Sequence, residues 1–172
     1  MNLEYGMSGN GRPFLFAYGS MWVRKTMANG ICILGSGDDA VLASVAPGLF
    51  DNPVDPSLAK QFLADPRHHM AVAIEAGVVV AFASGVDYIH PDKPREFWIN
   101  EVGVAPTHRG RGLGKAVLAA LLEHVRGLGC REAWVLTDTD NPAANALYRS
   151  LGGNAASGVS CGYEFQFDLD PR

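Results

Sequence analysis

The stretch Val102-Gly-Val-Ala-Pro-Thr-His-Arg-Gly-Arg-Gly-Leu-Gly-Lys115 decides the fold of this chain. A strand-like run from Phe97 to Val104 precedes its proline, and a helical repeat of apolar residues follows its glycines to about Leu128. A strand, a basic glycine-rich loop and a helix N-terminus in succession leave several backbone N–H groups available for an anion. The stretch therefore predicts an anion-binding site.

Two well-known phosphate loops do not fit this stretch. A nucleotide P-loop has glycine five residues before its Gly-Lys pair and a hydroxyl after it, whereas Gly114-Lys115 has Arg109 and Ala116 at those places. A dinucleotide-binding loop is spaced G-x-G-x-x-G and has an acidic residue about 20 positions later on a second strand. The glycines here are spaced G-x-G-x-G, so the anion is not expected to be a nucleotide held in either of these ways.

Composition limits the class of protein. The chain has 172 residues, 48% hydrophobic and 19% charged, which is typical of one soluble globular domain. Its net charge of −4 argues against nucleic-acid binding. The apolar run Phe14–Val23 is too short to span a bilayer and lacks the pattern of a signal peptide, so no membrane association is expected.

Cysteines and histidines do not predict a metal site. The three cysteines and five histidines show no CxxC or other ligand spacing, and the adjacent pair His68-His69 points to opposite faces if it lies on a strand. Reduced cysteines are typical of the cytoplasm. We interpret residues 1–29 as an N-terminal extension and residues 30–172 as a single domain.

The order of expected elements is β-α-α-β-β-β-α-β-α-β, which indicates an α/β protein. The turn between the second and third strands is expected at Ala76-Gly77. The elements are a strand at Ile31–Leu34, a helix from Asp38 or Asp39 to Ala46, a helix at Ser57–Ala64, strands at His69–Glu75, Val78–Asp87 and Arg95–Val104, a helix from Leu113 to about Leu128, a strand at Glu132–Thr137, a helix starting at Asn141-Pro142 and a strand at Tyr163–Leu169.

Two motifs resemble those of the GNAT acetyltransferase superfamily. Arg109, Gly112 and Gly114 match its acetyl-coenzyme A motif, Gln/Arg-x-x-Gly-x-Gly/Ala, and the segment from Asn141 to Tyr148 followed by Gly152 matches its N-x-x-A-x-x-x-Y-x-x-x-G element. The resemblance covers residues 30–170. It implies a mixed, mostly antiparallel sheet with helices on both faces and a splayed central strand pair.

The resemblance also implies acetyl-coenzyme A as co-substrate. Its pyrophosphate would accept hydrogen bonds from the N–H groups of residues 110–114 at the positive end of the helix, where glycines allow close approach. The splayed strand would offer peptide groups to the pantetheine arm. The cofactor-binding residues are expected to be Val102, Gly103, Val104, Arg109, Gly110, Arg111, Gly112, Leu113, Gly114, Lys115 and Asn141.

Two residues are candidates for catalysis of acetyl transfer to an amine. Glu101 interrupts an apolar strand, where it is either a general base, an anchor for an ammonium group or a solvent-facing residue. Tyr148 falls on the family's tyrosine, which implies that its phenol protonates the departing sulfur; the alternative is a core aromatic. No covalent acyl-enzyme is required, so transfer is expected by direct attack in a ternary complex.

The acceptor is expected to be a cationic amine. Within the superfamily, Pro94-Arg-Glu, the acidic residue two before Gly103 and Asp138-Thr-Asp-Asn-Pro142 are similar to the aminoglycoside 3-N-acetyltransferases. This similarity implies an antibiotic-resistance enzyme whose substrate is bound by carboxylates. The substrate-binding residues would be Asp51, Asp55, Asp138 and Asp140.

Other functions stay open at this point. One is acetyl transfer to an amino acid, a polyamine or a protein N-terminus, because acceptor loops diverge within one fold. A second, of another class, is a non-catalytic acyl-coenzyme A sensor. The resemblance further implies a homodimer.

Overall fold

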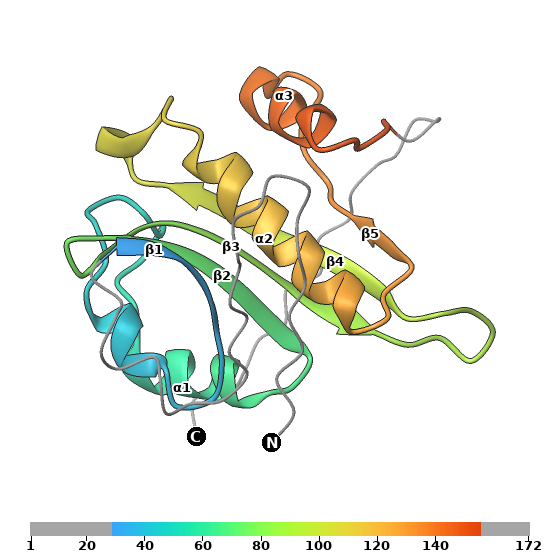
Figure 1. The fold of residues 1–172 in the computed structure, drawn as a ribbon, viewed down its shortest axis with the longest axis horizontal. Coiled ribbons are helices and arrows are strands. Elements are labelled where there is room, and N and C mark those ends of the chain that lie inside the picture. The colour runs from blue at the N-terminus through green and yellow to red at the C-terminus, as the bar shows by residue number, and fades with distance from the viewer. Residues whose placement is uncertain (1–28, 156–172) are drawn as a thin grey trace, which may run out of the picture.

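A five-stranded sheet organises the computed structural model, which describes residues 29–155 (Figure 1). The strand order is β1-β2-β3-β4-β5. The first four strands are antiparallel neighbours and β5 runs parallel to β4, so the predicted mixed sheet is confirmed. The elements are β1 (Asn29–Leu34), the 3-10 helix η2 (Asp39–Ala43), α1 (Pro56–Ala64), β2 (His68–Glu75), β3 (Val78–Tyr88), β4 (Glu96–Val104), the 3-10 helix η3 (Pro106–His108), α2 (Leu113–Gly127), β5 (Glu132–Trp134) and α3 (Pro142–Ser150).

Most of the expected elements are present within a residue or two of their predicted ends. The β2–β3 hairpin turns at Ala76 and Gly77, which have positive φ angles of 49° and 77°. Two such residues form the tight turn that suits the twist of a hairpin. The proposed N-terminal extension and the last predicted strand, Tyr163–Leu169, lie outside the described residues.

Two predicted elements were wrong in length. The helix expected from Asp38 to Ala46 is a short 3-10 helix that ends at Ala43. The chain then pairs with the start of β3. The carbonyl of Ser44 accepts a hydrogen bond from the N–H of Val79, and the N–H of Ala46 donates one to the carbonyl of Val79, both at 2.9 Å. The strand β5 ends at Trp134 instead of Thr137.

Helices cover both faces of the sheet. The neighbouring residues His68 and His69 of β2 point to opposite faces, as predicted. The ring of His69 lies 5.1 Å from that of His124 on α2, whereas the ring of His68 stacks at 4.7 Å on Phe62 of α1. The two helices therefore pack on opposite sides of the strands, with the core between them.

The helix α2 packs on its face of the sheet through the apolar stripe that the sequence predicts. Val117, Leu118, Leu121 and Val125 are all buried. Their spacing of three or four residues places them on one side of the helix. None of the helices in residues 29–155 is long and apolar enough to cross a membrane.

Candidate active site

The loop between β4 and α2 is shaped to receive an anion. Gly110 and Gly112 have φ angles of 75° and 78°, a left-handed conformation that glycine adopts without strain. A Cβ added at either position would meet no atom of residues 29–155 within 4 Å, so these residues leave the space beside the loop open. Gly112 precedes α2, and no side chain caps the helix. The N–H groups of its first turn therefore have no partner within the helix.

The end of β4 has an unpaired edge next to this loop. Pairing with β5 covers only Glu96 to Trp98, whereas pairing with β3 continues to Val104. After β5 the chain turns away from the sheet toward α3 (Figure 1). Among the described residues, the peptide groups on the β5 side of residues 100–104 therefore have no strand partner. This is the splayed strand pair that the resemblance implies.

Three elements meet at Gly114. A Cβ added there would lie 3.2 Å from Val104 Cγ2 on β4 and 3.9 Å from Leu147 Cδ2 on α3. The first turn of α2 therefore packs closely on the end of β4, and a side chain at residue 114 would require Val104 to shift. The same contact brings α3, which carries Tyr148, to the free end of β4.

The three basic residues of the loop have different surroundings. Arg109 folds back and donates a hydrogen bond from Nε to the carbonyl of Val104 at 3.3 Å. Arg111 forms an ion pair with Glu75 at the β2–β3 turn, with Nη2 2.7 Å from Oε1. Lys115 is exposed on the first turn of α2.

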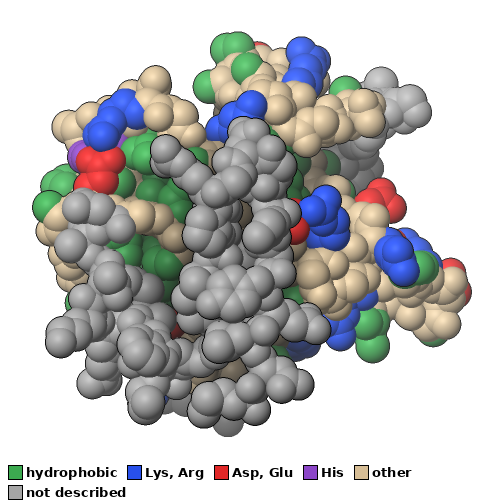
Figure 2. Space-filling model, in the orientation of Figure 1, with side chains coloured by type: hydrophobic (Ala, Val, Ile, Leu, Met, Phe, Trp, Pro, Cys, Tyr) green, Lys and Arg blue, Asp and Glu red, His purple; other side chains and the backbone are tan. Residues whose placement is uncertain are grey.

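His108 joins the same acidic side chain, with Nε2 3.6 Å from Glu75 Oε2. Figure 2 shows acidic, basic and histidine side chains gathered where the β2–β3 turn meets η3. Glu75 was not expected from the sequence. The pairing joins residues 36 positions apart, so no local pattern could have shown it.

A bulge in β4 determines which face Glu101 occupies. Ile99 pairs with Gly85 and Glu101 pairs with Ser84, which leaves Asn100 as an extra residue. Simple alternation from Phe97, which packs 5.9 Å from His69 on the α2 face, would place residue 101 on that same covered face. The extra residue instead places Glu101 on the opposite face, where it is exposed.

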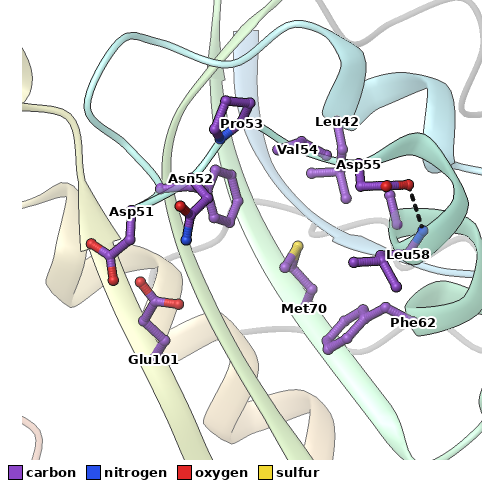
Figure 3. A pocket seen from close by; sticks show the side chains of 12 residues that line it. Leu42, Asp51, Asn52, Pro53, Val54, Asp55, Leu58, Phe62, Met70 and Glu101 are labelled. Carbon is purple, nitrogen blue, oxygen red and sulfur yellow. Dashed lines mark hydrogen bonds between the residues drawn. The ribbon is translucent and has the colours of Figure 1, made fainter. Parts of the chain in front are cut away.

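On this face Glu101 lines a pocket of about 340 Å³. Asp51, from the loop before α1, extends into the same end of the pocket, and Figure 3 shows the two carboxylates close together. Partial burial, and then the negative charge of Asp51, raise the pKa of Glu101 above the ordinary value for glutamate. A carboxyl group with a raised pKa is better suited to accept a proton near neutral pH.

The other three aspartates expected to bind substrate are placed differently. Asp55 caps α1: Oδ1 accepts hydrogen bonds from the N–H groups of Ser57 and Leu58 at 2.7 and 3.2 Å. A hydrogen bond from the Ser57 hydroxyl, and then these two backbone bonds, lower the pKa of Asp55, so its carboxylate stabilises the N-terminus of α1. Asp138 and Asp140 are exposed in the loop after β5 and are not among the described residues that line the pocket.

The helix α3 holds the two remaining candidates. Asn141 is its N-cap, and its side-chain oxygen accepts a hydrogen bond from the N–H of Ala144 at 3.0 Å. Tyr148 is half-buried and packs against the core beside Leu147 and Leu151. Burial raises the pKa of its phenol, which therefore stays protonated over the physiological range. A neutral phenol is the form that can donate a proton to a leaving group.

Comparison with known families agrees with this geometry. The model of the acetyltransferase (GNAT) family matches residues 42–152, which is most of the chain. The chain belongs to the GNAT family. The matched segment includes the loop, both catalytic candidates and the pocket, and acetyl-coenzyme A is the co-substrate of this family, as predicted.

Individual GNAT relatives differ in what their names say they act on. The chain is 36% identical over 102 residues to N-alpha-acetyltransferase RimI of Mycobacterium tuberculosis. The aligned segment covers 59% of this chain and 62% of that protein. It is 33% identical over 127 residues to a mycothiol acetyltransferase of Pseudarthrobacter chlorophenolicus, covering 69% of this chain but 39% of that protein.

A solved GNAT structure confirms the fold. AAC(6′)-Iy, in complex with a bisubstrate analogue, superposes with a TM-score of 0.64 over 80% of this chain and 99% of that one, at 20% identity. Such low identity is evidence of the fold alone. It gives no support to the predicted similarity to the 3-N enzymes in particular.

The apolar wall of the pocket is the part of the site that sequence reasoning missed. It comes from four short segments between residues 42 and 70, and no local pattern predicts that these segments face one pocket. The sequence predicts Leu58 on the apolar side of α1. In the structure Leu58 is nevertheless 62% exposed. The apolar wall consists of Leu42, Phe50, Pro53, Val54, Leu58, Ala59, Phe62 and Met70.

Proposed function

We propose that this protein transfers the acetyl group of acetyl-coenzyme A to a primary amine. The observation that carries the proposal is the position of Glu101. The bulge in β4 turns this carboxylate into a pocket beside Asp51, directly before the free strand edge and the open anion loop. Donor and acceptor can therefore bind on the two sides of one strand end, as direct transfer requires.

Acetyl transfer requires that the amine loses a proton, that the carbonyl oxygen is stabilised and that the leaving thiolate is protonated. The residues of the site can supply all three. Glu101, directly or through water, takes a proton from the ammonium group. The amine nitrogen then attacks the thioester carbonyl, whose developing negative charge is stabilised by a backbone N–H at the end of β4. The new C–N bond forms as the C–S bond breaks, and the Tyr148 hydroxyl protonates the departing thiolate.

Donor binding in this proposal relies on backbone more than on charge. The N–H groups of residues 110–114 at the N-terminus of α2 would hold the pyrophosphate. The peptide groups of residues 102–104 on the β5 side, which have no strand partner among the described residues, would hold the pantetheine arm. Lys115 is the basic residue best placed to add charge, because Arg111 is paired with Glu75. Asn141 would act through its cap on α3.

The carboxylates of the pocket indicate the class of acceptor. An aminoglycoside was the first expectation, and it is favoured by the paired carboxylates of Asp51 and Glu101. A polycation, however, needs several carboxylates, and the third carboxylate that lines the pocket, Asp55, already caps α1. A monoamine such as a protein N-terminus or an amino acid requires no more than the pair. The RimI relative is named an N-alpha-acetyltransferase, which favours a monoamine of this kind over a polycation.

A panel of acceptors tests the proposal. The full-length chain is mixed with acetyl-coenzyme A and kanamycin, spermidine, amino acids, simple amines or short peptides, and release of coenzyme A is measured with a thiol reagent. Release that depends on an amine supports the proposal. Binding of acetyl-coenzyme A without release in any mixture would instead support the non-catalytic sensor.

Two further expectations belong to the proposal. The family resemblance predicts a homodimer, which light scattering on the purified chain would detect. Cytoplasmic location is predicted from the composition, and fractionation of the source cells would test it.

A further inference from the structure

The pocket beside Glu101 has one charged end and one apolar wall. Asp51 and Glu101 lie together at one end, and the remaining wall consists mainly of hydrocarbon side chains (Figure 3). Its floor is Met70, only 5% exposed, and one side is the ring of Phe62. Stacking on His68, with ring centroids 4.7 Å apart, fixes the orientation of that ring.

Leu58 is an exposed part of this wall. It is 62% exposed on α1, one turn before Phe62, and its side chain lines the pocket. Folding leaves this apolar surface in contact with water, and covering it with a ligand would be favourable by about 25 cal/mol per Å². The wall therefore has an unused capacity to bind a hydrocarbon group.

The polar groups of the pocket limit what else the ligand can carry. No lysine or arginine is among the described residues that line the pocket, so a carboxylate on the ligand would face Asp51 and Glu101 without a cation. Asp55 also lines the pocket, but its Oδ1 already accepts three hydrogen bonds at the N-terminus of α1. Hydroxyl or further ammonium groups placed against the apolar wall would lose water without gaining partners.

Resting on the proposed acetyl transfer, we propose that the acceptor is a small primary monoamine with an alkyl or aryl group, such as an aralkylamine. Its ammonium group binds between Asp51 and Glu101, and its hydrocarbon group lies against Leu58, Phe62 and Met70. A volume of about 340 Å³ is at the lower end for ligand pockets, about 300–1,000 Å³, and suits one small molecule. A peptide would add amide groups that find only Asn52 as an uncharged polar side chain among the described lining residues.

The reaction is balanced without any other reactant. The ammonium loses one proton to Glu101 or water, and its nitrogen forms a C–N bond with the acetyl carbon. The C–S bond breaks, and the thiolate is protonated by Tyr148. The second proton, which the nitrogen loses as it becomes an amide, restores the Tyr148 hydroxyl. The products are an N-substituted acetamide, coenzyme A and one released proton.

Steady-state coenzyme A release with matched acceptors tests the specificity. The acceptors are 2-phenylethylamine, isoamylamine, ethanolamine, phenylalanine, a phenylalanine-initiated tetrapeptide, putrescine and kanamycin. We expect kcat/KM for the two apolar amines to exceed that for ethanolamine at least tenfold. A higher kcat/KM for the peptide, for kanamycin or for putrescine would overturn the proposal.

A pair of surface variants tests the wall itself. Leu58→Ser removes the exposed part of the wall, and we expect about a tenfold rise in KM for 2-phenylethylamine, equivalent to about 1.4 kcal/mol, with KM for acetyl-coenzyme A unchanged. Ile89→Ser makes a similar change at a residue that is 75% exposed outside the pocket, and it should alter neither constant. Equal effects of the two variants, or no effect of Leu58→Ser, would overturn the proposal.

Calorimetry separates the failure of this inference from failure of the proposed function. Binding of 2-phenylethylamine to the chain with coenzyme A, weakened in Leu58→Ser but not in Ile89→Ser, supports the pocket assignment even if no acetyl transfer occurs. Transfer to other amines without such binding overturns the pocket assignment and leaves the proposed function standing.

Discussion

At the scale of single residues, one extra residue in β4 determines the role of its neighbour. Without the bulge at Asn100, regular strand alternation would bury Glu101 under α2, where an unpaired carboxylate would be strongly destabilising. With it, the carboxylate reaches the pocket and lies beside Asp51. The sequence showed that an acidic residue interrupted an apolar strand, and the bulge explains why this costs the fold little.

The pair of carboxylates makes a prediction about pH. Glu101 must be ionised to accept a proton, and the charge of Asp51 raises the pKa of Glu101. In Asp51→Asn this repulsion is gone, so the pKa of Glu101 should fall and the acid limb of the kcat/KM profile should move to lower pH. Asp92→Asn, an exposed change in the β3–β4 loop, is the control and should leave the limb in place. An unmoved limb in both variants would mean that Glu101 does not titrate in the reaction.

Tyr148 makes a prediction about turnover. Removing its hydroxyl in Tyr148→Phe leaves the packing of α3 intact but deprives the thiolate of its proton donor. We expect kcat to fall by about 10²-fold, with KM for acetyl-coenzyme A nearly unchanged, measured by initial rates. Turnover at the wild-type level would assign Tyr148 to the core alone.

At the scale of elements, glycines allow the pieces of the site to approach one another. Gly114 lets α2 begin directly against Val104 and Leu147. Gly103 of β4 lies against Phe82, whose ring is stacked on Phe50 at 4.2 Å. These contacts hold the strand end, the loop and the pocket wall in a single arrangement.

A side chain at residue 103 should disturb this arrangement. A Cβ there would lie 2.5 Å from Phe82 Cε1 and 3.0 Å from the carbonyl oxygen of Leu49. We expect Gly103→Ala to lower the free energy of unfolding by about 1–3 kcal/mol, measured by urea denaturation. The control is Gly127→Ala on α2, where a Cβ meets nothing within 4 Å and helix propensity favours alanine by up to about 1 kcal/mol. A Gly103→Ala protein as stable as the control would show that Phe82 can move aside.

At the scale of the whole molecule, a polar chain joins α2 to the sheet beneath it. His124 Nε2 lies 3.2 Å from His69 Nδ1, and His69 Nε2 lies 2.8 Å from Asp87 Oδ1. His69 and Asp87 are buried. From the sequence, these histidines could only be described as buried or on the surface. Their contacts join residues 55 positions apart (His124 and His69) and 18 positions apart (His69 and Asp87).

This chain of side chains makes a prediction about stability and pH. Burial, and then His69, lower the pKa of His124 below the ordinary value of 6.5, so the unfolded chain takes up a proton before the folded one does. The stability contributed by neutral His124 is present above pH 6.5 and is lost as pH falls through the lowered pKa. Urea denaturation between pH 7.5 and 5 should show this loss, and His124→Gln should reduce it. An equal loss in the variant would assign the effect to other groups.

Local pattern determined most of the fold and half of the site. The helical repeat of α2, the alternation and turn of the hairpin, and the Asn-Pro start of α3 are each set by neighbours a few residues apart. The spacing of Arg109, Gly112 and Gly114 predicts an anion site, because backbone N–H groups and glycine conformations are local properties. The resemblance to the GNAT family also required the match from Asn141 to Tyr148.

Only the tertiary structure decided the acceptor side. The pairing of Asp51 with Glu101, the cap role of Asp55, the tie between Arg111 and Glu75 and the apolar wall at Leu58 all join residues whose contact depends on how the sheet and its helices pack. Tertiary contacts also set the lengths of η2 and β5. The chain after η2 pairs with β3, and the chain after β5 leaves the sheet toward α3, so neither element reaches the length predicted from its local sequence. The proposed donor site could be predicted from sequence because one continuous stretch builds most of it, whereas the proposed acceptor pocket joins residues between 42 and 70 to Glu101 on β4.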